Sequence, residues 1–137
     1  MAYIRASQGG GGELSEFVVW TNSSPTSNFP ASGNSDIIPL DFGYQISQFK
    51  YLKFVFRISN TKSEEHSVMV DAEDFKTAIQ GDGHIIPMIA FVGSTATYGR
   101  RFYYNSDNSI VMELCRQVSG SGNARNYVIP VKIIGLK

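Results

Sequence analysis

The chain has 137 residues, 12 basic and 12 acidic side chains, one cysteine and two histidines. The zero formal charge excludes a nucleic-acid binder that works by bulk charge, and the lone cysteine excludes an internal disulfide or a thiolate zinc site. A chain of this length buries enough surface to hold a core without metal or cofactor. We therefore expect no cofactor, no metal site and no nucleic-acid partner.

Residues 1–13 are predicted to form a flexible tail, because Gly9 to Gly12 are four consecutive glycines. The Gly-Lys-Ser/Thr ending of a phosphate loop does not follow them. Residues 14–137 then form a single domain. The tail lacks the apolar run of a secretory signal, and no apolar stretch approaches the roughly 20 residues of a membrane-spanning helix. We expect a protein made in the cytosol without a signal peptide and without membrane insertion.

Isoleucine and valine far outnumber leucine and alanine, which favours strands over helices. The predicted strands cover residues 16–20, 37–40, 51–58, 67–70, 85–92, 101–104, 110–118 and 127–134. Strict alternation is clearest in the third of them, where one face carries Leu52, Phe54, Phe56 and Ile58. Polar and glycine-containing turns separate the strands, and the longest loop covers residues 21–35.

One stretch, residues 71–80, has helical character. Phe75, Ala78 and Ile79 recur at helical spacing, acidic residues begin the stretch, and glycines follow it. Short strands at regular spacing are typical of sandwiches and barrels. The predicted fold is therefore an all-β, antiparallel, jelly-roll-like β-sandwich with at most one short helix near residues 71–80.

Few side chains are candidates for reactive chemistry. His84 follows Asp82, which could orient it, but a polar turn is the simpler interpretation. His66 is expected on the solvated surface, and Cys115 is expected to pack within a strand as a small hydrophobe. No sequence pattern of a nucleophilic or metal-dependent enzyme is present.

The acidic residues leave one catalytic alternative open. Asp71, Glu73 and Asp74 lack the spacing of a calcium-binding EF-hand loop and fit the start of a helical turn. A glycan hydrolase would need two facing carboxylates, such as Asp71 with Glu73 or Asp82 with Glu113.

Tyrosines near Asn and Arg residues suggest a sugar-binding surface, because sugars offer both C–H faces and hydroxyl groups. The candidate ligand-binding residues are Tyr98, Arg100, Tyr103, Tyr104 and Tyr127. The same tyrosines could instead pack within a sheet or between subunits. Residues 64–82 hold six acidic residues and one basic residue, whereas residues 100–137 hold six basic and two acidic residues. This asymmetry could steer association of like subunits or a partner.

Several segments resemble a known family. They are the stretch Trp20 to Phe29 (Trp-Thr-Asn-x-Ser-Pro-Thr-Ser-x-Phe), Leu40-Asp41 followed by the aromatic strand Tyr51 to Ile58, the segment Tyr98 to Arg101, and the terminal stretch Ile129 to Lys137, which is similar to Ile-Pro-x-Lys-Ile-x-Gly-Ile. The family consists of small β-rich domains of tail-fibre or baseplate proteins in phages and prophages of gut Firmicutes. The helical stretch at residues 71–80 departs from its pattern.

The resemblance implies a non-enzymatic, tail-associated structural protein of the virion, made in the bacterial cytoplasm. We expect a fibre-tip or baseplate module that attaches to a host-surface glycan. Its partners would be copies of itself, with a homotrimer favoured, and other phage tail proteins. The alternatives are a purely structural tail building block without a ligand and the glycan hydrolase considered above.

Overall fold

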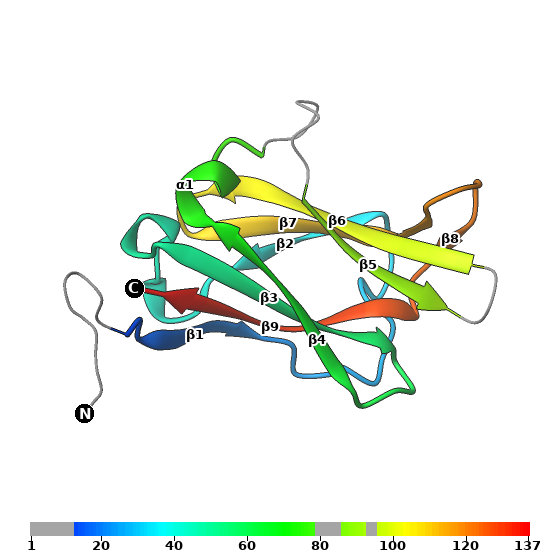
Figure 1. The fold of residues 1–137 in the computed structure, drawn as a ribbon. Coiled ribbons are helices and arrows are strands. Elements are labelled where there is room, and N and C mark those ends of the chain that lie inside the picture. Colours follow the sequence, from blue (N-terminus) through cyan, green and yellow to red (C-terminus); the bar gives the residue numbers. More distant parts are fainter. Residues whose placement is uncertain (1–12, 79–85, 93–95) are drawn as a thin grey trace.

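The computed structural model describes residues 13–78, 86–92 and 96–137. They form two antiparallel sheets packed face to face (Figure 1), so the predicted all-β sandwich is confirmed. The predicted tail lies outside the described residues except for Glu13, and so do Asp82 and His84.

Every predicted strand overlaps an observed one. The strands are β1 (Glu16–Thr21), β2 (Ser35–Pro39), β3 (Tyr51–Ser59), β4 (Glu65–Asp71), β5 (Ile86–Val92), β6 (Ala96–Ser106), β7 (Ser109–Gln117), β8 (Asn123–Ala124) and β9 (Tyr127–Leu136). The helical turns are η1 (Asp41–Gly43), η2 (Ile46–Gln48) and α1 (Ala72–Phe75). Strand β8 begins within a segment that the sequence predicts as a turn.

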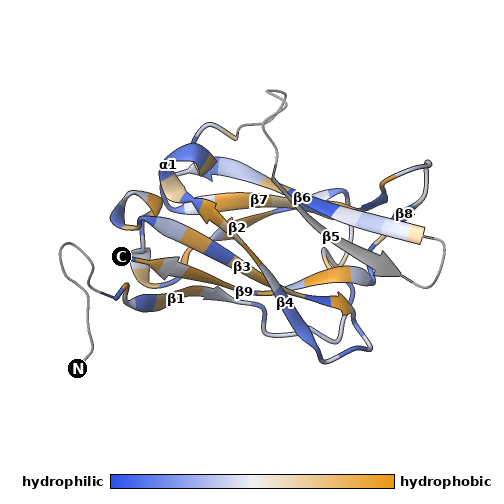
Figure 2. Ribbon diagram, in the orientation of Figure 1, coloured by the Kyte–Doolittle hydropathy of each residue, from blue (hydrophilic) through white to orange (hydrophobic). Residues whose placement is uncertain are grey.

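Strands that follow one another in the sequence do not always belong to the same sheet. The first sheet has the order β1-β9-β3-β4, and the second has the order β2-β7-β6-β5, with β8 paired to β7. Strands β1, β2 and β3 lie in the first, second and first sheet in turn, as in jelly-roll-like winding. By contrast, β3 and β4 are neighbours in the first sheet, and β5, β6 and β7 are successive neighbours in the second. The strands β7 and β9 are largely buried and largely hydrophobic, and many of the turns are hydrophilic (Figure 2).

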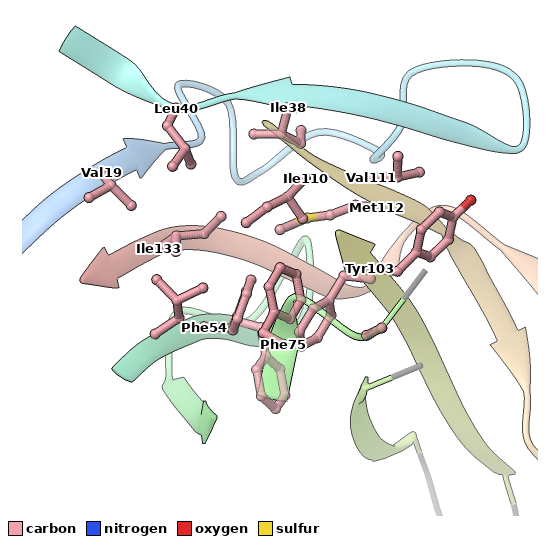
Figure 3. Close-up of a cluster of buried hydrophobic side chains, with 14 of the residues drawn as sticks. Val19, Ile38, Leu40, Phe54, Phe75, Tyr103, Ile110, Val111, Met112 and Ile133 are labelled. Atoms are coloured by element: carbon pink, nitrogen blue, oxygen red, sulfur yellow. The ribbon is translucent and has the colours of Figure 1, made fainter. Parts of the chain in front are cut away.

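Aromatic rings join the two sheets at the centre of the core. Phe54 of β3 stacks on Phe102 of β6 with 4.0 Å between ring centroids, and Phe75 of α1 packs against both rings. Figure 3 shows this cluster, with Ile110 and Ile133 contributed by the central strands of the two sheets. Leu52, Phe54 and Phe56 of β3 belong to this core, as the alternation predicts, whereas Ile58, predicted on the same face, is half-buried and outside the cluster.

The predicted helix is present but short. Asp71 caps α1, since its carboxylate accepts hydrogen bonds from the backbone N–H groups of Glu73 and Asp74 at 2.9 and 3.3 Å. Phe75 and Ala78, two of the residues at helical spacing, are buried together with Ala72, and the third, Ile79, lies outside the described residues. Among the residues described, no helix is long and apolar enough to cross a membrane.

The two ends of the described domain lie side by side. The backbone groups of Ser15 and Lys137 exchange two hydrogen bonds, at 2.7 and 3.1 Å, which extend the pairing of β1 with β9. The segment that links β7, β8 and β9 lies at the opposite end of the sandwich, beyond Tyr127 (Figure 1). The sandwich thus has a terminal end and a loop end.

Candidate functional site

Two of the predicted ligand-binding tyrosines meet at the loop end. Tyr98, near the start of β6, and Tyr127, the first residue of β9, place their ring centroids 4.8 Å apart with an angle of 41° between the planes. Both side chains are half-buried, packed against the main core on one side. We call Tyr98 and Tyr127 the tyrosine pair.

A tight turn borders the tyrosine pair. Gln117 pairs with Tyr98 in register, and its backbone N–H donates to the carbonyl of Gly122 at 2.7 Å. A methyl group added at Gly120 or Gly122 would lie 2.9 Å from Gln117 Oε1, too close for a carbon atom. The glycines therefore allow the turn to close over the Gln117 amide, beside the two rings.

Arg100 does not lie on the surface beside the tyrosines as predicted. Its side chain is fully buried, and its guanidinium donates four hydrogen bonds to backbone carbonyls. The acceptors are Phe29 (2.7 Å), Glu113 (2.7 Å), Tyr127 (2.9 Å) and Val128 (2.7 Å). Burial lowers the pKa of Arg100 to about 10, so the group stays charged at neutral pH.

The physical reason for this burial is the number of donors. A guanidinium carries five N–H donors in a rigid fork, and four carbonyl oxygens converge on it here. One of them belongs to Tyr127 itself, so Arg100 fixes the backbone beneath the tyrosine pair. The sequence prediction placed Arg100 in a ligand contact; the structure makes it a support for the tyrosines.

The other two predicted tyrosines lie elsewhere. Tyr103 is 4% exposed and pairs with Val111 on β7. Burial first, and then the charge of Glu113, raise the pKa of Tyr103. Tyr104 packs edge-on against Phe75, with centroids 6.5 Å apart, near α1 and away from the loop end. Of the predicted tyrosines, the structure therefore brings together two half-buried rings, Tyr98 and Tyr127.

The carboxylates considered for a glycan hydrolase cap a helix or lie near basic side chains. Asp71 caps α1, and Glu73 lies 3.8 Å from the Lys76 ammonium. Glu113 is nearly buried and forms an ion pair with Arg101 at 2.6 Å. Asp82, the carboxylate that would face Glu113 in a hydrolase, lies outside the described residues.

The remaining reactive candidates are separated from one another. Cys115 is fully buried on β7, where burial raises its pKa from 9.0 to about 11 and the charge of Arg100 opposes the rise. This is the packing role predicted for it. His66 is exposed, as predicted, but it belongs to β4 and not to a turn. Within the described part of the chain, no three His, Cys, Asp or Glu side chains cluster as metal ligands would.

A second candidate site, not identified from the sequence, lies on the outer face of the first sheet. It is an open groove of about 310 Å³. Its lining residues are Glu16, Lys53, Val55, Glu65, His66, Ser67, Lys132 and Ile134. The alternation of Tyr51 to Ile58 predicts that Lys53 and Val55 share a face, but it contains no information about which residues of β9 and β4 lie beside them.

Comparisons with protein-family models, with curated proteins and with solved structures found no match to this chain. The geometry of the two candidate sites is therefore the basis for assigning a function.

Proposed function

We propose that the protein is a non-enzymatic attachment module of the phage or prophage tail type, which binds a host-surface glycan through the tyrosine pair. The observation that carries this proposal is the contact of two partly exposed rings, 4.8 Å apart, beside a turn that contains the Gln117 amide. Aromatic faces bind the C–H faces of sugars, and amides bind their hydroxyl groups.

The support beneath the pair favours binding without large rearrangement. Arg100 holds the carbonyls of Tyr127 and Val128, and the pair packs on the core. A rigid platform loses little conformational entropy when a ligand binds. A single aromatic platform gives weak affinity, so we further propose that the protein acts as a homo-oligomer, with a trimer favoured, in which several weak sites combine.

The test is binding to intact host cells and to a glycan array by purified wild type, Tyr98→Ala and Tyr127→Ala. We expect each substitution to weaken binding about two- to tenfold, from the loss of one aromatic contact. Tyr104→Ala is the matched control, because Tyr104 is also half-buried but lies against Phe75 near α1. Thermal unfolding of each variant confirms that it is folded.

The alternatives give different results in the same experiment. A wild-type protein that binds no cell and no glycan, yet assembles with tail proteins, would support the purely structural building block. Release of sugar reducing ends that stops in Asp71→Asn or Glu113→Gln would support the hydrolase.

A further inference from the structure

Strand pairing brings two lysines together on the outer face of the first sheet. Lys132 of β9 pairs with Val55 of β3, and Ile134 of β9 pairs with Lys53 of β3. Lys53 and Lys132 are therefore diagonal neighbours on adjacent strands, about 7–8 Å apart at the backbone. Two ammonium groups at this separation can both reach one anionic group.

The charge of these lysines is not neutralised by the ion pairs of the described residues, none of which includes Lys53 or Lys132. The carboxylates that line the groove, Glu16 and Glu65, come from the two edge strands, whereas the lysines come from the two central strands. Arg57, two residues beyond Val55, is not a lining residue of the groove, and it pairs in register with Glu65.

The floor of the groove is apolar although it faces away from the main core. Val55 and Ile134 are each 5% exposed, and they belong to a second buried cluster with Val131 and Leu136. Ser67 of β4 pairs with Val55, so the groove combines a closely packed floor with two cations and with oxygen acceptors at its edges.

We propose that this groove binds a saccharide that carries a carboxylate or phosphate group. The anionic group would lie between Lys53 and Lys132, and sugar hydroxyls would donate to Glu16 and Glu65, which line the same groove. The groove volume of about 310 Å³ fits a ligand of one or two sugar rings, at the small end of ligand sites. This site is separate from the tyrosine pair, and the proposal stands independently of it.

The test measures binding of three probes by calorimetry: an oligogalacturonate, a phosphorylated oligosaccharide and a neutral oligosaccharide of equal length. We expect binding of at least one anionic probe and a loss of about tenfold or more in Lys53→Gln/Lys132→Gln, since each charged hydrogen bond contributes substantially. Lys50→Gln/Lys62→Gln is the matched control, because it removes the same charge from exposed lysines outside the groove.

The anionic probe that binds identifies the acidic group as a carboxylate or a phosphate. Amide chemical shifts provide a second measurement on the wild type: signals of Lys53, Ser67 and Lys132 should move, and those of Tyr98 and Tyr127 should not.

The proposal is overturned if neither anionic probe binds, if the neutral probe binds equally well, or if the control pair loses as much affinity. It is also overturned if the groove variant changes the oligomeric state without changing ligand affinity, because a second copy then covers this face. Loss of binding in Tyr98→Ala but not in the lysine variant assigns the ligand to the tyrosine pair.

Discussion

Arg100 connects three segments of the chain that are distant in sequence. Its hydrogen bonds reach the loop that contains Phe29, strand β7 at Glu113, and the start of β9 at Tyr127 and Val128. Its guanidinium also lies over the Phe29 ring, 5.4 Å from the centroid. A buried charge is tolerated only when its donors are matched in this way.

We predict that Arg100→Ala lowers the free energy of unfolding by more than about 3 kcal/mol, because it leaves buried carbonyls without a donor. Arg100→Lys keeps the charge but not the planar fork, so we expect an intermediate loss of about 1–3 kcal/mol. Urea unfolding measures both. Arg116→Ala, on the exposed side of the same sheet, is the control and should change stability little. A lysine variant as stable as wild type would contradict this account.

Cys115 gives a prediction about alkaline pH. Its pKa is about 11 in the folded protein and 9.0 when exposed, so above pH 9 the unfolded state releases the thiol proton and the folded state does not. The contribution of the protonated Cys115 thiol to the free energy of unfolding is fully present below pH 9 and is lost as the pH rises toward 11. By pH 10 the loss is about 1.4 kcal/mol relative to pH 7.

The measurement compares urea unfolding of wild type and Cys115→Ala from pH 7 to pH 10. The difference between them should shrink as pH rises, because only wild type has the thiol, while Arg100 is present in both. A constant difference across this range would mean that burial of Cys115 does not perturb its ionisation.

The positions of individual residues in the candidate site were only partly predictable from the sequence. The sequence places tyrosines and Arg100 close together, and a charged strand residue is normally expected at the surface because burial of a charge is unfavourable. What reverses the expectation is the convergence of carbonyls from Phe29, Glu113 and Tyr127, which depends on three segments that no local pattern connects. Tyr98 and Tyr127 meet for the same reason, through the pairing of distant strands.

At the level of secondary structure, the positions of the strands were predictable from the sequence, but the pairing of one strand with another was not. Alternation identifies β3, and β-branched runs identify β7 and β9. The helical spacing at residues 71–80 also corresponds to α1, although the helix ends at Phe75. The sequence contains no signal that β9 lies between β1 and β3, and the outer-face groove depends entirely on that arrangement.

The packing between β9 and the segment before β3 depends on a glycine. Gly135 lies beneath the ring of Phe49, and a methyl group added there would be 2.5 Å from Phe49 Cδ1. Phe49 is 6% exposed and contacts Phe17 of β1, with ring centroids 6.1 Å apart. The ring therefore has little room to move away from an added side chain.

We predict that Gly135→Ala lowers the free energy of unfolding by about 1–3 kcal/mol, as overpacking does in tight cores. In a Phe49→Leu background the smaller side chain should accept the methyl group, so the cost of Gly135→Ala should fall by about 1 kcal/mol or more. Urea unfolding of the two single variants and the double variant tests this. Additive losses would show that Phe49 is not the obstacle.

At the scale of the whole molecule, the terminal end and the loop end are separated by the length of the strands. The tyrosine pair lies at the loop end, and Ser15 and Lys137 lie together at the other (Figure 1). In the proposed attachment module, connections made through either terminus leave the tyrosine pair exposed.

The adjacency of Ser15 and Lys137 also determines how the domain responds to mechanical force. Hydrogen bonds in an antiparallel pair run perpendicular to the strands. Pulling residues 15 and 137 apart opens the β1–β9 pairing one bond at a time, whereas pulling residue 15 against residue 121 slides β1 along β9 and strains all the bonds together. We predict a clearly lower unfolding force for the first pair of handles than for the second in single-molecule pulling, and equal forces would contradict this reading. In the proposed attachment module, a load between the terminal end and the tyrosine pair would pull the domain in its stronger direction.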